Sequence, residues 1–210
     1  MTTVLPTTVK ARTPEAETLG NYRSLCGRLE VHRLDVFREA HKSILPFVQG
    51  LRFSALLTYE IRKALRGSRL TASWGVILAN DPKPSPECDI IIHHEDDCEC
   101  EWNGGDDLRS GPVMHFRFIK PACAKLVISC KSTLRSIHAG IKRDFWNLAP
   151  HVGRVWLFAE CCGGNPDRLG ERAKQAGYER FWWLYSEGGV KNYNEPGWFE
   201  FVKELKKIGK

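Results

Sequence analysis

Two residues at the ends of predicted β-strands have the chemistry to cleave a phosphate ester together. Asp89 begins an apolar strand at residues 88–93 (CDIIIH), and 42 positions later Lys131 follows a second one at residues 124–130 (AKLVISC). The ends of neighbouring strands can meet at one edge of a sheet, where the carboxylate would bind Mg²⁺ through oxygen. A lysine beside that metal can orient a water molecule near the phosphate. The spacing therefore predicts a metal-assisted hydrolytic site.

Such a site needs at least one more acid, and two helical acids are candidates. The first position to consider, two residues before the lysine and on the same strand face, holds Ser129. Asp144 lies in the apolar stripe of a predicted helix at 136–148, and Glu60 lies in that of a helix at 51–65. Each carboxylate should meet a cation, because an unpaired acid facing the sheet is costly. Salt bridges and N–H caps are the alternative, but two such acids favour a shared site.

The elements that must position these residues follow the order α-α-β-β-β-β-α-β-α-β-α. Antiparallel strands come first and alternate with helices later, which predicts an α/β fold with a mixed sheet flanked by helices on both faces. We expect a flexible arm at 1–20 and a single domain at 21–210. The other predicted helices are 22–44 (ended by Pro46), 167–176 and 198–208, and the other predicted strands are 70–79, 113–119, 154–159 and 181–185.

Charge is distributed unevenly along the chain. Residues 95–107 contain seven acids and no Lys or Arg, so the formal net charge of +6 becomes +13 without them. A basic body suits phosphate binding, although a surplus of charge can also serve solubility. The acidic stretch is predicted as part of a loop or a long hairpin tip at 95–112, and it is either a solvated tip or an anionic cover for the site.

Composition excludes several other classes of protein. No apolar run approaches the ~20 residues that span a membrane, and the N-terminus lacks a secretory stretch, so we expect a cytoplasmic protein. The spacing of the eight cysteines matches neither a disulfide framework nor a zinc site. No phosphate-cradling glycine motif and no Ser/His/Asp or Cys/His arrangement occurs.

Three segments in order resemble the PD-(D/E)xK nuclease superfamily: GVI at 75–77, SPECDIII at 85–92 and AKLVISCKS at 124–132. More closely they resemble a bacterial domain group in which a Ser-x-Gln-x-Asp-Ile strand precedes a Glu-Val-Lys-Ser strand. The resemblance covers about residues 51–159. It implies a restriction-endonuclease-like fold.

By this resemblance, Asp89 is the metal-binding acid, Lys131 the catalytic lysine and Glu60 the acid of the preceding helix. Glu87 takes the position of the glutamine and becomes a further metal ligand. Ser129 departs from the usual Glu, but some restriction enzymes with Ser-x-Lys take the acid from the next helix, twelve or thirteen residues beyond the lysine. Asp144 stands thirteen positions after Lys131. The implied catalytic set is Asp89, Lys131, Asp144 and Glu60, and the implied metal set is Asp89, Asp144, Glu60 and Glu87.

The resemblance implies a Mg²⁺- or Mn²⁺-dependent endonuclease that hydrolyses double-stranded DNA, as an effector of restriction or anti-phage defence. A homodimer or a partner protein of a defence complex is expected. A catalytically inactive module that binds nucleic acid or a partner protein, and an RNA nuclease, are the alternatives. Basic residues that bracket the site could follow a phosphate backbone, and Trp74 and Trp102 are candidates for base stacking. The basic residues are Arg62, Arg66, Arg135 and Arg143.

Overall fold

The computed structural model of the chain describes part of the sequence. The predicted arm at 1–20 and the predicted helix at 22–44 lie outside it. Among the described residues, no helix combines the length and apolarity that a membrane crossing requires. The described residues are 45–78, 83–95, 98–102, 116–187 and 192–208.

Seven strands form one mixed sheet among these residues. They are β1 (Leu70–Ile77), β2 (Cys88–His94), β3 (Cys98–Trp102), β4 (Phe116–Ile119), β5 (Ala124–Leu134), β6 (Val155–Cys162) and β7 (Arg180–Ser186). Their spatial order is β3-β4-β1-β2-β5-β6-β7. Strand β5 pairs antiparallel with β2 and parallel with β6, so it has one antiparallel and one parallel neighbour. The pairs β1–β2 and β3–β4 are antiparallel, whereas β1–β4 and β6–β7 are parallel.

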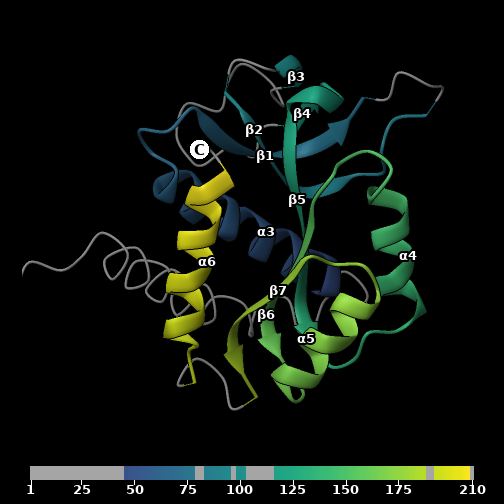
Figure 1. Ribbon diagram of the computed structural model, residues 1–210, viewed down its shortest axis with the longest axis vertical. Coiled ribbons are helices and arrows are strands. Elements are labelled where there is room, and N and C mark those ends of the chain that lie inside the picture. The colour runs from purple at the N-terminus through teal and green to yellow at the C-terminus, as the bar shows by residue number, and fades with distance from the viewer. Residues whose placement is uncertain (1–44, 79–82, 96–97, 103–115, 188–191, 209–210) are drawn as a thin grey trace, which may run out of the picture.

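Helices cover both faces of the sheet. Helices α3 (Leu45–Ala64) and α6 (Glu195–Ile208) pack on one face, and α4 (Ala139–Leu148) and α5 (Pro166–Gln175) pack on the other. In Figure 1, α6 lies to the left of the strands and α4 and α5 lie to the right. A short 3-10 helix, η1 (Pro121–Cys123), leads into β5.

The two faces have cores of different composition, because successive residues of a strand point to opposite faces. Ile90 of β2 packs under α3 and α6, and its neighbour Ile91 packs under α4 and α5. The first face is rich in aromatic rings; the ring centroids of Phe158 and Phe201 lie 4.9 Å apart in an edge-to-face arrangement. The second face is mainly aliphatic, and Ile141 is one of the α4 residues in it.

The structure corrects three predictions about the elements. The helix predicted to start at 51 begins at Leu45 as α3, and Pro46 lies in its first turn, where its missing N–H leaves no bond unmade. The segment predicted as a loop or hairpin tip at 95–112 begins with a strand, because Cys98–Trp102 forms β3 and pairs antiparallel with β4. Strand β5 continues to Leu134, four residues beyond its predicted end.

The cysteines behave as small apolar residues, as expected from their positions. Cys88, Cys130 and Cys162 are buried free thiols, Cys161 is a half-buried free thiol, and Cys123 is half-buried. Burial raises the pKa of the Cys88 thiol to about 12, so this thiol stays protonated at neutral pH. Cysteine is therefore a packing residue in the described core.

Candidate active site

The candidate site lies where β2 and β5 separate. Their described backbone pairing begins at Ile90 opposite Ile128. Beyond it, the Cys130 amide N–H donates to Oδ2 of Asp89 at 2.8 Å, in place of a bond to the backbone of β2. The carboxylate thus satisfies the amide that the end of the ladder would leave unpaired. This bond fixes Asp89 at the divergence of the two strands.

The charge state of Asp89 reflects its crowded position. Burial raises the pKa of this carboxyl, while the Cys130 amide and Lys131 lower it. The neighbouring acids Glu87 and Asp144 raise it further. Three carboxylates therefore lie close enough to act on one another beside a single lysine. Such a group is stabilised by an added cation.

Asp144 and Lys131 form an ion pair across the strand and the covering helix. Lys131 Nζ lies 3.0 Å from Asp144 Oδ2, and the side chains are 26% and 38% exposed. Asp144 faces inward because the α4 residues Ile141 and Leu148 anchor that side of the helix in the core. The helix has a defined start, since Nδ1 of its N-cap His138 accepts a hydrogen bond from the Gly140 amide. The structure thus brings Asp89, Lys131 and Asp144 together.

Tyr178 is a residue at this site that sequence reasoning missed. Its hydroxyl donates to the Ile141 carbonyl at 2.9 Å, which ties the α5–β7 connection to α4. Burial raises the pKa of Tyr178, Asp144 and Asp89 raise it further, and a side-chain hydrogen bond with Ser129 lowers it. The phenol therefore lies beneath the carboxylates as a neutral group. Ser129 itself is buried and supplies no charge.

A glycine places Tyr178. Gly177 has a φ of 107°, and a Cβ there would lie 2.2 Å from a ring carbon of Phe145. Only glycine suits both the backbone angle and the contact. The sequence signals a helix stop at this glycine, but no local pattern indicates that the following tyrosine turns toward α4.

Glu87 lies near the site but makes another contact. It is exposed just before β2, and the Trp74 Nε1–H donates to its Oε1 at 2.6 Å. The ring of Trp74 also packs against Phe116, with centroids 4.8 Å apart. Among the described residues, no group of three or more His, Cys, Asp or Glu side chains is arranged to hold a metal ion. Of the predicted metal ligands, Asp89 and Asp144 lie near each other at the site, and Glu87 is turned toward Trp74.

Glu60 is placed apart from these residues. It belongs to α3, whose neighbouring residues Phe53 and Leu57 pack on the face opposite α4. Its side chain is 0% exposed, and Lys63 Nζ lies 3.6 Å from its Oε2. Neither of its oxygens has a hydrogen-bond partner, and burial raises the pKa of the carboxyl while Lys63 lowers it. The structure does not bring Glu60 to the Lys131–Asp144 pair.

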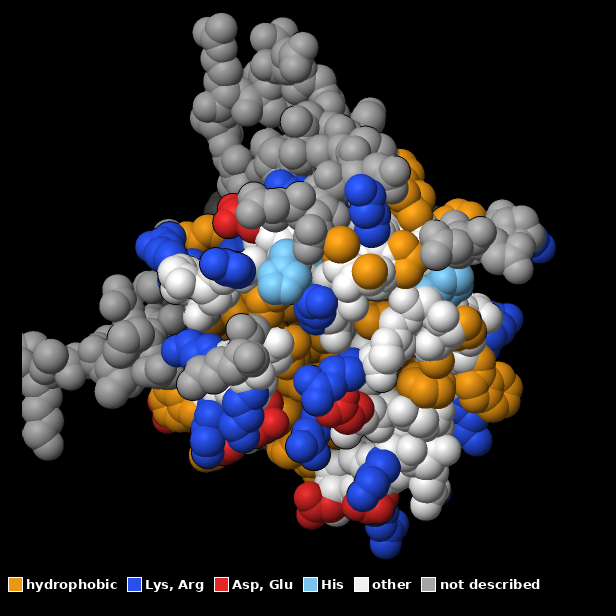
Figure 2. Space-filling view, turned by 45° about the horizontal axis from the view of Figure 1, so that its top comes forward, with side chains coloured by type: hydrophobic (Ala, Val, Ile, Leu, Met, Phe, Trp, Pro, Cys, Tyr) orange, Lys and Arg blue, Asp and Glu red, His pale blue; other side chains and the backbone are white. Residues whose placement is uncertain are grey.

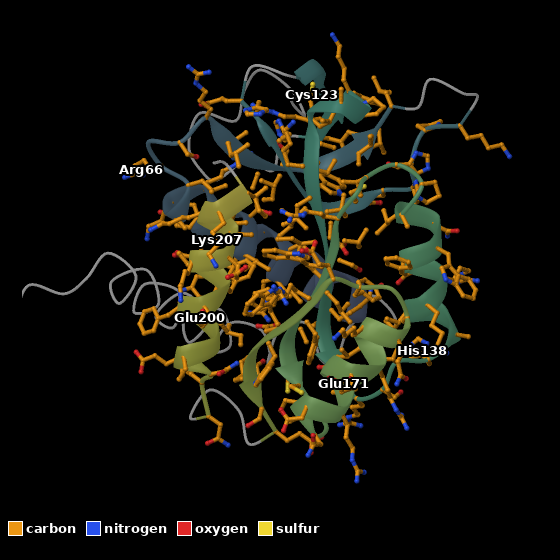
Figure 3. The ribbon with its side chains drawn as sticks, in the orientation of Figure 1. Arg66, Cys123, His138, Glu171, Glu200 and Lys207 are labelled. Carbon is orange, nitrogen blue, oxygen red and sulfur yellow. The ribbon has the colours of Figure 1, made fainter. Side chains whose placement is uncertain are left out.

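The four predicted nucleic-acid-binding arginines divide between two sides of the molecule. Arg62 donates from Nε to the Ala72 carbonyl at 2.6 Å and so helps to hold α3 on β1. Figure 3 shows Arg66 on the side of the molecule away from His138, which begins α4. Arg143 is exposed on α4 directly before Asp144, and Arg135 is exposed between β5 and α4 with its Nε 3.7 Å from Glu187. Arg135 and Arg143 are therefore the two on the α4 side.

Comparison with known proteins supports the fold. No protein family model and no curated protein matches the sequence. Among solved structures, the chain is similar to NucC of P. aeruginosa ATCC27853 in its cAAA-bound form, with a TM-score of 0.59 and 12% identity over 96% of this chain and 94% of that one. It is also similar to NucC of E. coli MS115-1 in its cAAA-bound form, with a TM-score of 0.56 and 9% identity over 97% of this chain and 94% of that one.

NucC is a nuclease with the PD-(D/E)xK fold. The described sheet and its helices therefore have the restriction-endonuclease-like architecture that the sequence predicts, and the predicted fold class is confirmed.

Proposed function

We propose that this protein is a divalent-metal-dependent endonuclease that hydrolyses DNA phosphodiester bonds. The observation that carries the proposal is the convergence of Asp89, Lys131 and Asp144 where β2 and β5 separate, with Lys131 Nζ 3.0 Å from Asp144 Oδ2. A nuclease fold alone does not establish nuclease activity, so the proposal depends on the residues of the site.

The donor set suits Mg²⁺ or Mn²⁺. Asp89 and Asp144 offer carboxylate oxygens. Burial and, to a lesser degree, repulsion by Glu87 and Asp144 raise the pKa of Asp89, and a cation between the two carboxylates would relieve both effects. Mg²⁺ is commonly bound by one or two carboxylates together with water and substrate phosphate. Two protein ligands are therefore sufficient. Glu87 would join them through water if its contact with Trp74 opened.

The residues of the chain divide the chemistry among them. A metal bound at this site would polarise the phosphate and lower the pKa of a bound water molecule. Asp89, held by the Cys130 amide, would keep its oxygens directed at the metal. Lys131 would leave Asp144, orient the attacking water and stabilise the charge that develops on the phosphate. Glu60 is a predicted participant whose role stays a prediction.

A DNA substrate and a role in anti-phage defence are supported by the similarity to NucC, a nuclease of anti-phage defence, and by basic residues near the site. Arg135 and Arg143 would hold phosphates on either side of the scissile bond. In Figure 2, blue Lys and Arg side chains are spread over much of the face shown, with fewer red acids among them. We place the protein in the cytoplasm, where its thiols would stay reduced, and expect a homodimer or a defence-complex partner.

The test of this function is cleavage of double-stranded DNA in Mg²⁺ by the wild type and by Lys131→Ala and Asp89→Ala. Loss of either group should lower kcat at least about 10³-fold, because each acts on the reacting phosphate or its metal. Unchanged circular dichroism would show that the fold is intact. Lys207→Ala on α6 is a matched charge control and should cleave like the wild type. Cleavage that persists in both site variants would refute the assignment.

A non-catalytic module that binds nucleic acid or a partner protein is the second candidate, and Ser129 favours it. This buried residue stands where the superfamily usually has Glu, so the site has one acid fewer at that position. Calorimetry with Mg²⁺ or Mn²⁺ separates the two candidates. Metal uptake by the wild type that is lost in Asp144→Asn supports the enzyme, whereas no uptake supports the module. Cleavage assays with RNA in parallel test the RNA nuclease alternative.

A further inference from the structure

The outer face of α4, defined here as Ala139, Lys142, Arg143 and Trp146, exposes an aromatic ring among cations. Trp146 is 65% exposed and is the most exposed large apolar side chain among the described residues. Sequence reasoning favoured Trp74 and Trp102 for stacking on bases. Trp74, however, is half-buried, donates a hydrogen bond to Glu87 and packs against the ring of Phe116. The side chain of Trp102 lies outside the described part of the structure. Among the tryptophans whose side chains are described, Trp146 is the most exposed.

Cations surround this ring. Lys142 and Arg143 are exposed and lie four and three positions before Trp146, so both are its neighbours on the helix surface. The helix has one acid, Asp144, and its carboxylate points inward to Lys131. On the right of Figure 2, the side on which α4 lies, orange side chains are bordered by blue ones with no red between them. The face is therefore aromatic and positively charged.

These features favour a nucleic-acid strand over a second copy of the chain. Two copies that met through this face would oppose Lys142 and Arg143 to the same residues of the partner, which is unfavourable. A strand of nucleic acid offers phosphates to the cations and the flat face of a base to the indole. Bases inside a duplex cover one another, so a stacking tryptophan requires an unpaired nucleotide.

The position of this face relative to the site gives the strand a path. Around α4, Gly140 and Asn147 separate Asp144 from Arg143, and Trp146 lies further round on the outside. The distance is on the order of one helix diameter, about 10 Å. Gly140 has no side chain, and the ring of the N-cap residue His138 lies against it, so His138 and Asn147 line the surface between the site and the outer face. A strand whose phosphate lies at Asp144 can therefore continue over the helix to Trp146.

We propose that the outer face of α4 binds an unpaired segment of the DNA substrate next to the scissile phosphate. Lys142 and Arg143 hold its phosphates, and Trp146 stacks on one base. The substrate class is thus DNA with a single-stranded stretch, such as a frayed end, a flap or a bubble. The path to the scissile phosphate rests on the proposed function, whereas the binding surface rests on Trp146 and its neighbours.

The test is fluorescence anisotropy with labelled single-stranded and duplex DNA of equal length, without divalent metal, on the full chain. Trp146→Ala should raise the Kd for single strands at least about 5-fold and change the Kd for duplex less, because stacking requires an exposed base. Trp146→Phe should retain most of the affinity. Arg143→Ser and Lys142→Ser should each make the Kd less dependent on salt concentration, by the amount expected for the loss of about one phosphate contact.

Tyr59→Ala is the matched control. Tyr59 is 45% exposed on α3 with Lys63 Nζ 5.6 Å from its ring centre, so it is an aromatic–cation pair on the other face of the sheet. It should bind DNA like the wild type. Equal loss in Tyr59→Ala and Trp146→Ala would overturn the proposal. So would an unchanged Kd in Trp146→Ala, including the case in which sedimentation shows that this variant only dissociates an oligomer.

The DNA-binding experiment and the cleavage experiment can fail independently of each other. A protein that cleaves through Lys131 but binds DNA equally well with and without Trp146 retains the proposed function and refutes the α4 surface. A protein that cleaves nothing but loses single-strand binding in Trp146→Ala retains the surface as a binding site and refutes the nuclease.

Discussion

Helices α3 and α4 cover opposite faces of the sheet, and each carries an acid that points toward the sheet. The two acids have different surroundings. Asp144 of α4 meets Lys131 at 3.0 Å and keeps 38% of its side chain exposed. Glu60 of α3 is fully buried, and its nearest cation, Lys63, is 3.6 Å away on the same helix. Both acids interrupt an apolar stripe in the same way. Only Asp144 faces the point where two strands separate and leave room for water and substrate.

The comparison shows what makes an inward acid useful for chemistry. A catalytic carboxylate has to reach a cation and solvent together, because metal and water must enter. Asp144 meets this condition, since both it and Lys131 are partly exposed. Glu60 is fully buried beside the aromatic core under α3 and α6. A carboxylate there reduces stability, because its oxygens lack a hydrogen bond and Lys63 Nζ lies 3.6 Å away. We therefore propose that Asp144 serves the candidate site, whereas the buried carboxylate of Glu60 reduces stability.

The largest expected effect that tests this contrast is on activity. Asp144→Asn should lower kcat about 10²-fold or more and weaken Mg²⁺ binding, because it removes a charged metal ligand. Glu60→Gln should change kcat less than about 3-fold. Steady-state kinetics at saturating Mg²⁺ and a Mg²⁺ titration measure both. A comparable loss in Glu60→Gln would place Glu60 in the active site, as the sequence resemblance implies, and would break the contrast.

A smaller effect is expected at Tyr178, whose hydroxyl holds α4 through the Ile141 carbonyl. Tyr178→Phe removes one buried hydrogen bond, worth about 1 kcal/mol, and lets α4 shift at Asp144. We expect kcat to fall about 5-fold and half-maximal activity to require more Mg²⁺. Tyr59→Phe is the control for the loss of a phenol on the other face. An unchanged Mg²⁺ requirement together with a lower Tm would make Tyr178 a purely structural residue.

The sequence predicted what local pattern and spacing determine. Asp89 and Lys131 stand out because each marks the end of an apolar run, and the apolar spacing of α4 turns Asp144 inward. The same argument turned Glu60 inward correctly. It could not tell which face α3 covers, because that depends on the path of the chain through the whole sheet. The parallel pairing of β1 with β4 depends on the same path.

Two other features were missed for different reasons. Strand β3 was hidden by its acids, although Cys98, Cys100 and Trp102 alternate with Glu99 and Glu101 in the period of two typical of an edge strand. Tyr178 carried no local signal at all, since its partner Ile141 lies 37 positions away. A long-range contact of this kind requires the fold to be known first.

The smallest expected effect is on stability. Its dependence on pH tests the contrast between Glu60 and Asp144. Burial raises the pKa of Glu60 above its ordinary value of 4.5, so the ionised carboxylate opposes folding at neutral pH. Glu60→Gln should increase the free energy of unfolding at pH 8 by about 1 kcal/mol. The gain should shrink as the pH falls toward the ordinary pKa of 4.5, because the wild-type carboxyl then becomes protonated and loses its penalty.

Glu204→Gln is a control with the opposite sign. A side-chain hydrogen bond from Lys207 lowers the pKa of Glu204, so its carboxylate stabilises the fold above its ordinary pKa and loses that effect as the pH falls. Since the ion pair lies at the surface, where Lys207 is exposed and Glu204 half-buried, Glu204→Gln should produce only a small loss at pH 8. Thermal and urea unfolding of both variants between pH 5 and pH 8 measure the two slopes. A destabilised Glu60→Gln at pH 8 would mean that the buried carboxylate has a stabilising partner, and Glu60 would then resemble Asp144.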